Sequence, residues 1–140
     1  PVGRLDKDTE GLLLITNDGK LAHALLSPKK QVEKTYYVET KDEVTKEMEH
    51  RLCQGVDIGE DKFTLPAKTK LLSKTSLHLT ITEGKFHQVK RMLKAVGTEV
   101  IYLKRISMGS LTLDPKLEKG EYRMLTEKEL EALKEDTARK

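Results

Sequence analysis

The feature that most constrains this chain is a short charged loop, Gly3–Gly11, which begins and ends with glycine and runs into the apolar segment Leu12–Ile15. Between Arg4 and Asp8 the loop holds two carboxylates, one arginine and one lysine. An apolar run bounded by a turn signal predicts a buried strand. Carboxylates beside cations keep a low pKa, as a nucleophile or general base requires at neutral pH. The alternative is an exposed polar turn without a chemical role. Clusters of charge are common on protein surfaces and contribute little to stability.

The size and charge of the chain set further limits. Its 140 residues suffice for one domain, residues 1–140, with a single core. Hydrophobic residues make up 36% and charged residues 35%, which is typical of a soluble globular protein. The net charge of +3 is too small to indicate a partner, but the segment Lys85–Arg105 holds six basic residues and one acid. Such a stripe indicates a polyanion partner, with a solvated helix face as the alternative.

The remaining composition argues against several classes of protein. The single cysteine, Cys53, excludes an intramolecular disulfide and is typical of a reducing compartment. No apolar run approaches the length of a membrane span and no signal peptide precedes the loop, so we expect a cytoplasmic protein without membrane association. The histidines and the cysteine form no metal-binding pattern, and no dinucleotide or phosphate-loop motif is present. Because the chain starts at Pro1 rather than Met, we interpret it as a fragment of a longer protein.

Hydrophobic periodicity predicts helices and strands after the loop. We expect helices over residues 21–26, 45–54 and 89–96, and a final helix that opens at a capping box in residues 126–129. We expect strands over residues 12–15, 33–40, 68–72, 76–82 and 99–108, with a short return strand over residues 111–113. The strand over residues 76–82 alternates most clearly, with its inward apolar residues at Leu77, Leu79 and Ile81.

The helix over residues 89–96 carries a second cluster of charged side chains. Its apolar stripe has the spacing i, i+3, i+4 and i+7 and comprises Val89, Met92, Leu93 and Val96. The basic residues toward the other side are His87, Lys90, Arg91 and Lys94. One interpretation is a solvated cationic face. The other is that the first turn points a cation into a site while the rest contacts phosphate.

The segment Gly3-Arg4-Leu5-Asp6 resembles the central motif of the RNA pseudouridine synthases, in particular the RsuA-type family that modifies ribosomal RNA. Further segments match in order and at the family's spacing: residues 8–14 and 16–19, Lys34-x-Tyr36, Gln88-Val89-Lys90 and residues 120–125. The connector over residues 55–67 resembles the small-subunit branch. The resemblance implies an α+β fold, with a mixed, mainly antiparallel sheet and helices packed around it. It also implies that the family's N-terminal RNA-binding domain and first strand are absent.

The resemblance assigns roles to five residues. Asp6 would attack the nucleoside or remove a sugar proton, and these alternatives stay open. Lys90 would pair with Asp6, and Arg4 would fill the gap left by the flipped base. Tyr36 would form a wall of the uracil pocket, with core packing as the alternative, and Val89 would lie beneath the base. Arg91 is an alternative to Lys90 as the partner of Asp6.

The expected RNA-binding side chains are the basic residues around the second cluster: Lys85, His87, Arg91, Lys94, Lys104 and Arg105. The implied reaction is isomerisation of a uridine to pseudouridine in ribosomal RNA. The RNA that we expect as substrate is the 16S RNA of the small subunit. The reaction needs no cofactor or metal, and we expect a monomer. The rival interpretation is a non-catalytic RNA-binding module or an inactive fragment. A glycoside hydrolase using Asp6 and Asp8 is disfavoured, because sugar sites use aromatic platforms and the chain has no Trp.

Overall fold

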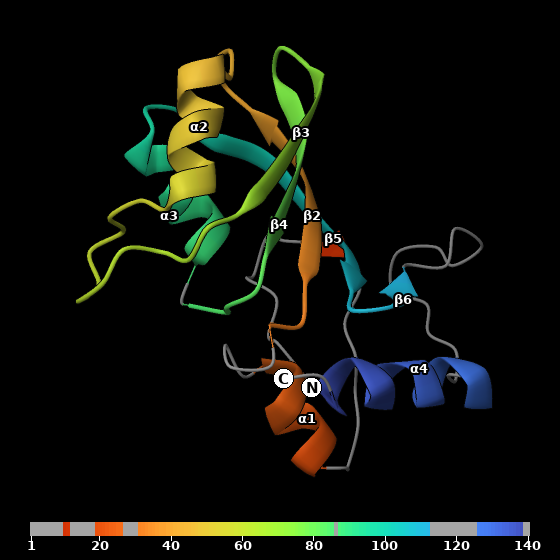
Figure 1. Ribbon diagram of the computed structural model, residues 1–140. Coiled ribbons are helices and arrows are strands. Elements are labelled where there is room, and N and C mark those ends of the chain that lie inside the picture. Colours follow the sequence, from red (N-terminus) through yellow and green to blue (C-terminus); the bar gives the residue numbers. More distant parts are fainter. Residues whose placement is uncertain (1–9, 12–18, 27–30, 86, 113–125, 139–140) are drawn as a thin grey trace.

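The computed structural model describes residues 10–11, 19–26, 31–85, 87–112 and 126–138 (Figure 1). The strands are β1 (Glu10–Gly11), β2 (Lys34–Thr40), β3 (Lys68–Ser73), β4 (Ser76–Ile81), β5 (Val100–Met108) and β6 (Leu111–Thr112). The helices are α1 (Gly19–Leu26), α2 (Lys46–Gln54), α3 (Gln88–Ala95) and α4 (Glu127–Ala138).

The strands form one sheet in the order β1-β5-β2-β4-β3, with β6 also paired to β5. The β1–β5 pair is parallel, and the other described pairs are antiparallel. The expected α+β fold with a mixed, mainly antiparallel sheet is therefore confirmed. The strand order departs from chain order, so β5 lies between β1 and β2 and pairs with both of them. This crossover assembles the candidate site described below.

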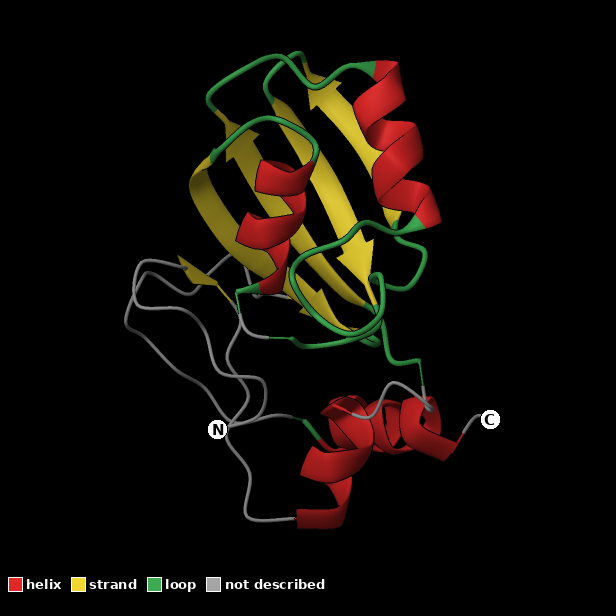
Figure 2. Cartoon of the chain, turned by 90° about the vertical axis from the view of Figure 1, so that its left-hand side faces the viewer, coloured by secondary structure: helices red, strands yellow, loops and turns green. Residues whose placement is uncertain are grey.

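Helices α2 and α3 lie against the same face of the sheet (Figure 2). Apolar residues from that face and from both helices form the main core. Its buried members are Val38, Val44, Leu52, Val56, Ile58, Ala67, Leu77, Leu79, Ile81, Val89, Met92, Leu93, Val96 and Leu103. All four residues of the predicted stripe on α3 belong to this core, so the predicted amphipathic helix is confirmed. The inward positions predicted for β4 are likewise buried.

A second, smaller cluster joins α1 and α4 to the end of the sheet near β6 (Figure 1). Its buried residues are Leu25, Val32, Met108, Leu111 and Leu133. The predicted capping box of α4 is present, because Thr126 and Glu129 each accept a hydrogen bond from the other's backbone N–H. Asp136 of α4 accepts two hydrogen bonds of 2.8 Å from Ser110 in the β5–β6 turn. The helix is thus fixed to the sheet by apolar and polar contacts.

The helix expected at 45–54 is also confirmed: Thr45 caps its N-terminus and Gly55 its C-terminus. The strand expected over residues 12–15 lies outside the described residues, as does residue 113 of the return strand. Within the described part of the chain, no helix is both long and apolar enough to cross a membrane.

Candidate active site

The candidate site lies where three neighbouring strands meet. Gly11 of β1 is paired with Arg105 of β5, and Arg105 is paired on its other side with Tyr36 of β2. In antiparallel strands, directly paired residues point to the same face, so Arg105 and Tyr36 both face the helices. The end of the predicted catalytic loop therefore lies one strand from Arg105 and two strands from Tyr36.

A β-bulge places Arg105 on the helix-covered face. Along β2, the partner in β5 changes from Arg105 opposite Tyr36 to Ser107 opposite Thr35, so Ile106 has no partner residue in the register. An extra residue shifts the alternation of the strand by one position. As a result, Arg105 and Met108 both point inward, with exposed fractions of 1% and 0%.

Lys34 is a second buried cation on this face. It is 1% exposed, and its Nζ donates to the backbone oxygens of Val32 and Thr82 at 3.3 and 3.5 Å. The pKa of Lys34 is lowered from 10.5 to about 8. The main cause is burial, since the charged form loses hydration; the Arg105 charge also lowers the pKa, and the Glu83 charge opposes both. The alternation of β2 places Lys34, Tyr36 and Val38 on one face.

Tyr36 itself is half-buried and packs against the main core. This agrees with the core-packing interpretation made from sequence, and the role of Tyr36 as a wall of the uracil pocket stays a prediction. Val89 in the first turn of α3 is 4% exposed, and Lys90 beside it is half-buried. Asp6 and Arg4 lie outside the described residues, so the pairing of Asp6 with Lys90 stays a prediction.

Arg91 is engaged with the connector that precedes β3. Its Nη2 donates to the backbone oxygen of Ile58 and lies 3.1 Å from Oε2 of Glu60, with which it forms an ion pair. These contacts fix the connector onto α3. Whether Lys90 or Arg91 pairs with Asp6 stays a prediction, because Asp6 lies outside the described residues.

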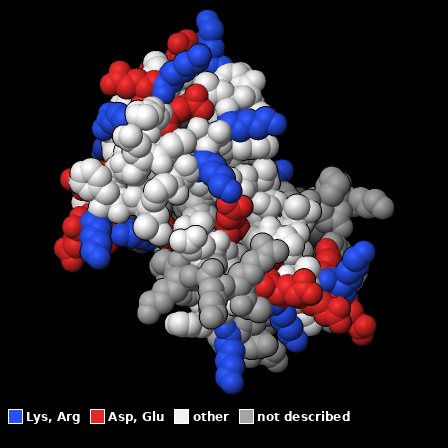
Figure 3. Space-filling view, in the orientation of Figure 1, with Lys and Arg blue, Asp and Glu red and all other residues white. Residues whose placement is uncertain are grey.

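The other predicted RNA contacts are distributed over both faces of the sheet. Lys104 is paired with Tyr37, so it faces away from α2 and α3. On that face the Tyr37 ring lies edge-on to the rings of His78 and Tyr102, with centroid distances of 6.2 and 5.9 Å. The basic stripe seen in the sequence is therefore not one continuous surface. Figure 3 likewise shows Lys and Arg interspersed with Asp and Glu.

On the helix side, Lys85 is half-buried with its Nζ 4.0 Å from Oε2 of Glu83, and His87 begins α3 with a left-handed backbone, φ 47°. Lys94 is exposed. Arg105 differs from these residues because it is buried. Its burial favours a role inside the candidate site over a contact with RNA phosphate.

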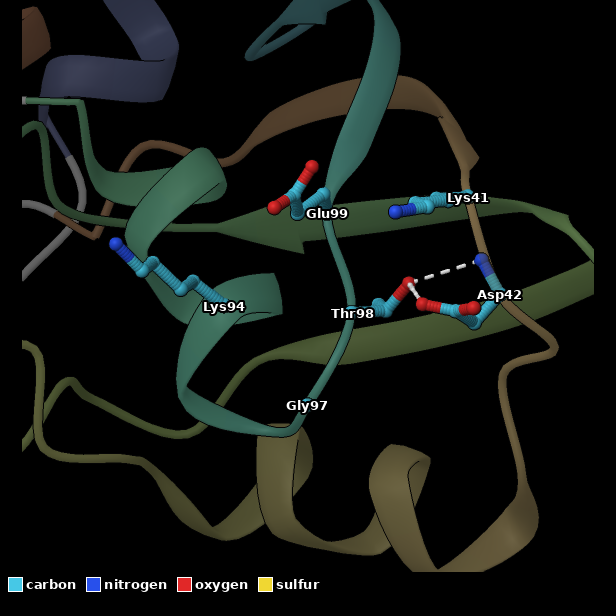
Figure 4. Close-up of a pocket in the computed structure, with 6 residues that line it drawn as sticks. All are labelled: Lys41, Asp42, Lys94, Gly97, Thr98 and Glu99. Carbon is cyan, nitrogen blue, oxygen red and sulfur yellow. Dashed lines mark hydrogen bonds between the residues drawn. The ribbon is translucent and has the colours of Figure 1, made fainter.

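A shallow hollow lies apart from this site, beyond the C-terminus of α3 (Figure 4). Its lining consists of Lys41, Asp42, Lys94, Gly97, Thr98 and Glu99. The Thr98 hydroxyl accepts from the backbone N–H of Asp42 at 3.1 Å and donates to its carboxylate at 3.2 Å. Two lysines balance two carboxylates, and the Thr98 hydroxyl and the Asp42 carboxylate are already hydrogen-bonded to each other. The hollow offers no arrangement suited to catalysis.

The sequence analysis assigned no role to Glu83. It included Gln88 in the Gln88-Val89-Lys90 segment but gave the Gln88 side chain no function. Glu83 and Gln88 are 4% and 3% exposed and are hydrogen-bonded to each other at 2.9 Å. A signal for Glu83 was present in the sequence. Continuing the alternation of β4 beyond Ile81 places residue 83 on the buried side. In the described part of the chain, no group of three or more potential ligand side chains could hold a metal ion.

The sequence profile of the family described as RNA pseudouridylate synthase matches residues 1–95, and the chain belongs to that family. A crystal structure of a pseudouridylate synthase superposes with a TM-score of 0.90 at 46% identity, covering 94% of this chain and 57% of that one.

Comparison with curated relatives shows which members of this family the chain is similar to. The chain is 58% identical over 142 residues to the uncharacterized RNA pseudouridine synthase YtzG of Bacillus subtilis, covering 99% of this chain and 59% of that protein. It is 49% identical to ribosomal small subunit pseudouridine synthase A of Vibrio cholerae, covering 94% and 57%. The Escherichia coli protein of the same name is 45% identical, covering 91% and 56%. The chain thus spans less than three fifths of the length of these relatives.

Proposed function

We propose that this chain converts a uridine of ribosomal RNA to pseudouridine, and that the RNA is that of the small subunit. The observation that carries the proposal is the β1–β5–β2 arrangement, which joins Gly11, Arg105 and Tyr36. It is supported by membership of the family and by the similarity to small-subunit synthases. We propose that residues 1–140 form one catalytic domain that acts as a monomer in the cytoplasm.

The reaction is an isomerisation in which atoms and electrons balance. The bond between C1′ of the ribose and N1 of the uracil breaks, the uracil turns, and a bond forms between C1′ and C5. The hydrogen on C5 leaves as a proton, and N1 gains one. Because there is no net oxidation or reduction and no group is transferred to another molecule, the chemistry can be carried by side chains of the protein alone.

Within this proposal, Asp6 is the catalytic carboxylate, acting as nucleophile or base, and Lys90 holds it ionised. An adjacent cation favours the charged form of a carboxylate, so Asp6 stays reactive at neutral pH. Arg4 fills the space that the flipped uridine leaves in the RNA. Tyr36 and Val89 form the walls of the base pocket, which is supported by their half-buried and buried positions beside the core.

Contacts with the RNA phosphates would come from basic side chains around α3 and β5. The proposed residues are Lys85, His87, Arg91, Lys94, Lys104 and Arg105, of which Arg105 is the weakest candidate because it is buried. Phosphate contacts dominate the affinity of proteins for nucleic acids, so binding should weaken steeply with salt.

The test is the release of tritium from C5 of labelled uridine in a transcript of small-subunit ribosomal RNA. We expect Asp6→Asn to abolish release without unfolding the domain, because the amide is neither a nucleophile nor a base. The matched variant Asp8→Asn in the same loop should retain most of the activity. Equal losses would refute the assignment of Asp6. RNA binding by the wild type without tritium release would favour a non-catalytic binding module instead.

A further inference from the structure

We propose that Glu83 is a positioning residue of the candidate active site, which holds the first turn of α3 in the orientation that the reaction requires. This inference rests on the proposed function. Glu83 lies just beyond β4 and is 4% exposed, and among the described residues it is the only buried carboxylate. Burying a carboxylate is unfavourable unless it is paired or hydrogen-bonded, so its contacts indicate what it does.

The carboxylate of Glu83 joins three segments of the chain. Its Oε1 accepts hydrogen bonds from the backbone N–H of Leu65 at 2.7 Å and from Nε2 of Gln88 at 2.9 Å. Its Oε2 lies 4.0 Å from Nζ of Lys85. The end of β4, the connector before β3 and the start of α3 are therefore held together by one side chain.

The start of α3 depends on these contacts because it lacks an ordinary cap. The N-cap residue, His87, has φ 47° and ψ 38°, and its side chain makes no capping hydrogen bond. An ordinary N-cap has extended backbone and a side chain that accepts from the first turn. Here Gln88 closes the turn instead: its Oε1 accepts from the backbone N–H of Lys85, and its own N–H donates to the Lys85 oxygen, both at 3.1 Å.

Glu83 determines which way the amide of Gln88 points. An ionised carboxylate accepts hydrogen bonds and cannot donate them, so it binds the NH₂ group and leaves the amide oxygen for Lys85. Without the carboxylate, this preference is lost and the turn loses its fixed orientation. Val89 and Lys90 follow Gln88 directly, so a rotation of the turn would displace both the base-pocket wall and the proposed partner of Asp6.

The charge of Glu83 also acts on the adjacent strand. Burial and Arg105 lower the pKa of Lys34, and Glu83 opposes them. Lys34 shares its face of β2 with Tyr36. One carboxylate therefore acts on both elements that supply the proposed base pocket, through hydrogen bonds to α3 and through its charge at β2.

The test compares Glu83→Leu, which removes both acceptors, with Glu83→Gln, which keeps an oxygen that can accept the same two hydrogen bonds. In the tritium-release assay we expect Glu83→Leu to lower kcat about 30-fold while KM changes less than about threefold. Glu83→Gln should recover at least about a third of the wild-type kcat. The matched control is Glu49→Leu, because Glu49 of α2 is also partly buried and accepts from the Thr69 hydroxyl at 2.8 Å. It should keep the wild-type kcat.

If Glu83→Leu does not fold, Gln88→Leu removes the same hydrogen bond from the other side and should show the same fall in kcat at nearly constant KM. Wild-type kcat in a folded Glu83→Leu or Gln88→Leu variant would overturn the proposal.

Amide hydrogen exchange separates this inference from the proposed function. We expect residues 88–91 to exchange at least about tenfold faster in Glu83→Leu than in the wild type, with α2 unchanged. Unchanged exchange in α3 would overturn the positioning role whether or not the protein has turnover. A wild type that releases no tritium would instead refute the proposed function.

Discussion

Replacing Lys34 with methionine tests the energetic effect of the buried ammonium group beside Tyr36. Burial and Arg105 lower the pKa of Lys34 from 10.5 to about 8, against the opposing charge of Glu83. At about 1.4 kcal/mol per pH unit, that difference corresponds to about 3 kcal/mol by which the protonated amine destabilises the fold. Methionine has a similar length and carries no charge, so Lys34→Met removes this contribution.

The sign of the effect follows from proton binding. Below about pH 8 the amine is protonated in the folded and the unfolded chain, so the destabilisation is present in full. Between about pH 8 and 10.5 only the unfolded chain retains the proton, so the free energy of unfolding rises with pH. Above that range neither form is charged. Relative to Lys34→Met, the wild type should therefore gain about 3 kcal/mol between about pH 7 and 10.5.

Urea unfolding at several values of pH across this range measures the difference directly. Effects of other titrating groups cancel, because they are shared by wild type and variant. At neutral pH the gain in the variant is reduced by the loss of hydrogen bonds to Val32 and Thr82. The control is Lys70→Met, at an exposed position of β3. Its free energy of unfolding should change with pH in the same way as that of the wild type. If the free energy of unfolding of Lys34→Met also changes with pH as that of the wild type does, the buried ammonium is not the source of the pH dependence.

Two further predictions concern backbone strain and a surface hydrogen bond. Gly97→Ala should cost about 1–2 kcal/mol of unfolding free energy, because φ is 109° there but no atom crowds a Cβ. Gly55→Ala should cost more, since its Cβ would collide with the backbone oxygen of Thr64; equal midpoints in urea would contradict this. The hydrogen bond from Tyr37 to Glu39 raises the pKa of Tyr37, so Glu39→Gln should lower that pKa. Tyrosinate absorbance measures the change, and an unshifted titration would exclude Glu39 as its cause.

Elements defined by local periodicity were predicted well from the sequence. Residues 76–82 alternate because one face of β4 is buried. The apolar residues of α3 recur at helical spacing because they pack into the same core. The capping box of α4 was predictable because both of its partners lie within four residues. In these cases, the signal and the structure that it specifies occupy the same short stretch of chain.

The site could be predicted only in part, because its geometry depends on contacts between distant segments. Simple alternation along β5 predicts that every second residue faces inward. The unpaired Ile106 breaks that pattern, so Arg105 and Met108 are both buried. The role proposed for Glu83 involves a hydrogen bond from Leu65, 18 residues before it. Asp6 follows from the resemblance, and its position lies outside the described residues.

The register of β5 therefore matters as much to the proposed function as the charged loop does. In a strand, a shift by one residue turns every side chain to the opposite face. Without the bulge, a continuous register fixed at Met108 would turn Arg105 away from α3 and pair Tyr36 with a different residue. Since β1 is paired with the same stretch of β5, the place of Gly11 relative to Tyr36 depends on this register as well. The bulge at Ile106 is the feature that lets a buried core and a candidate catalytic site share one strand.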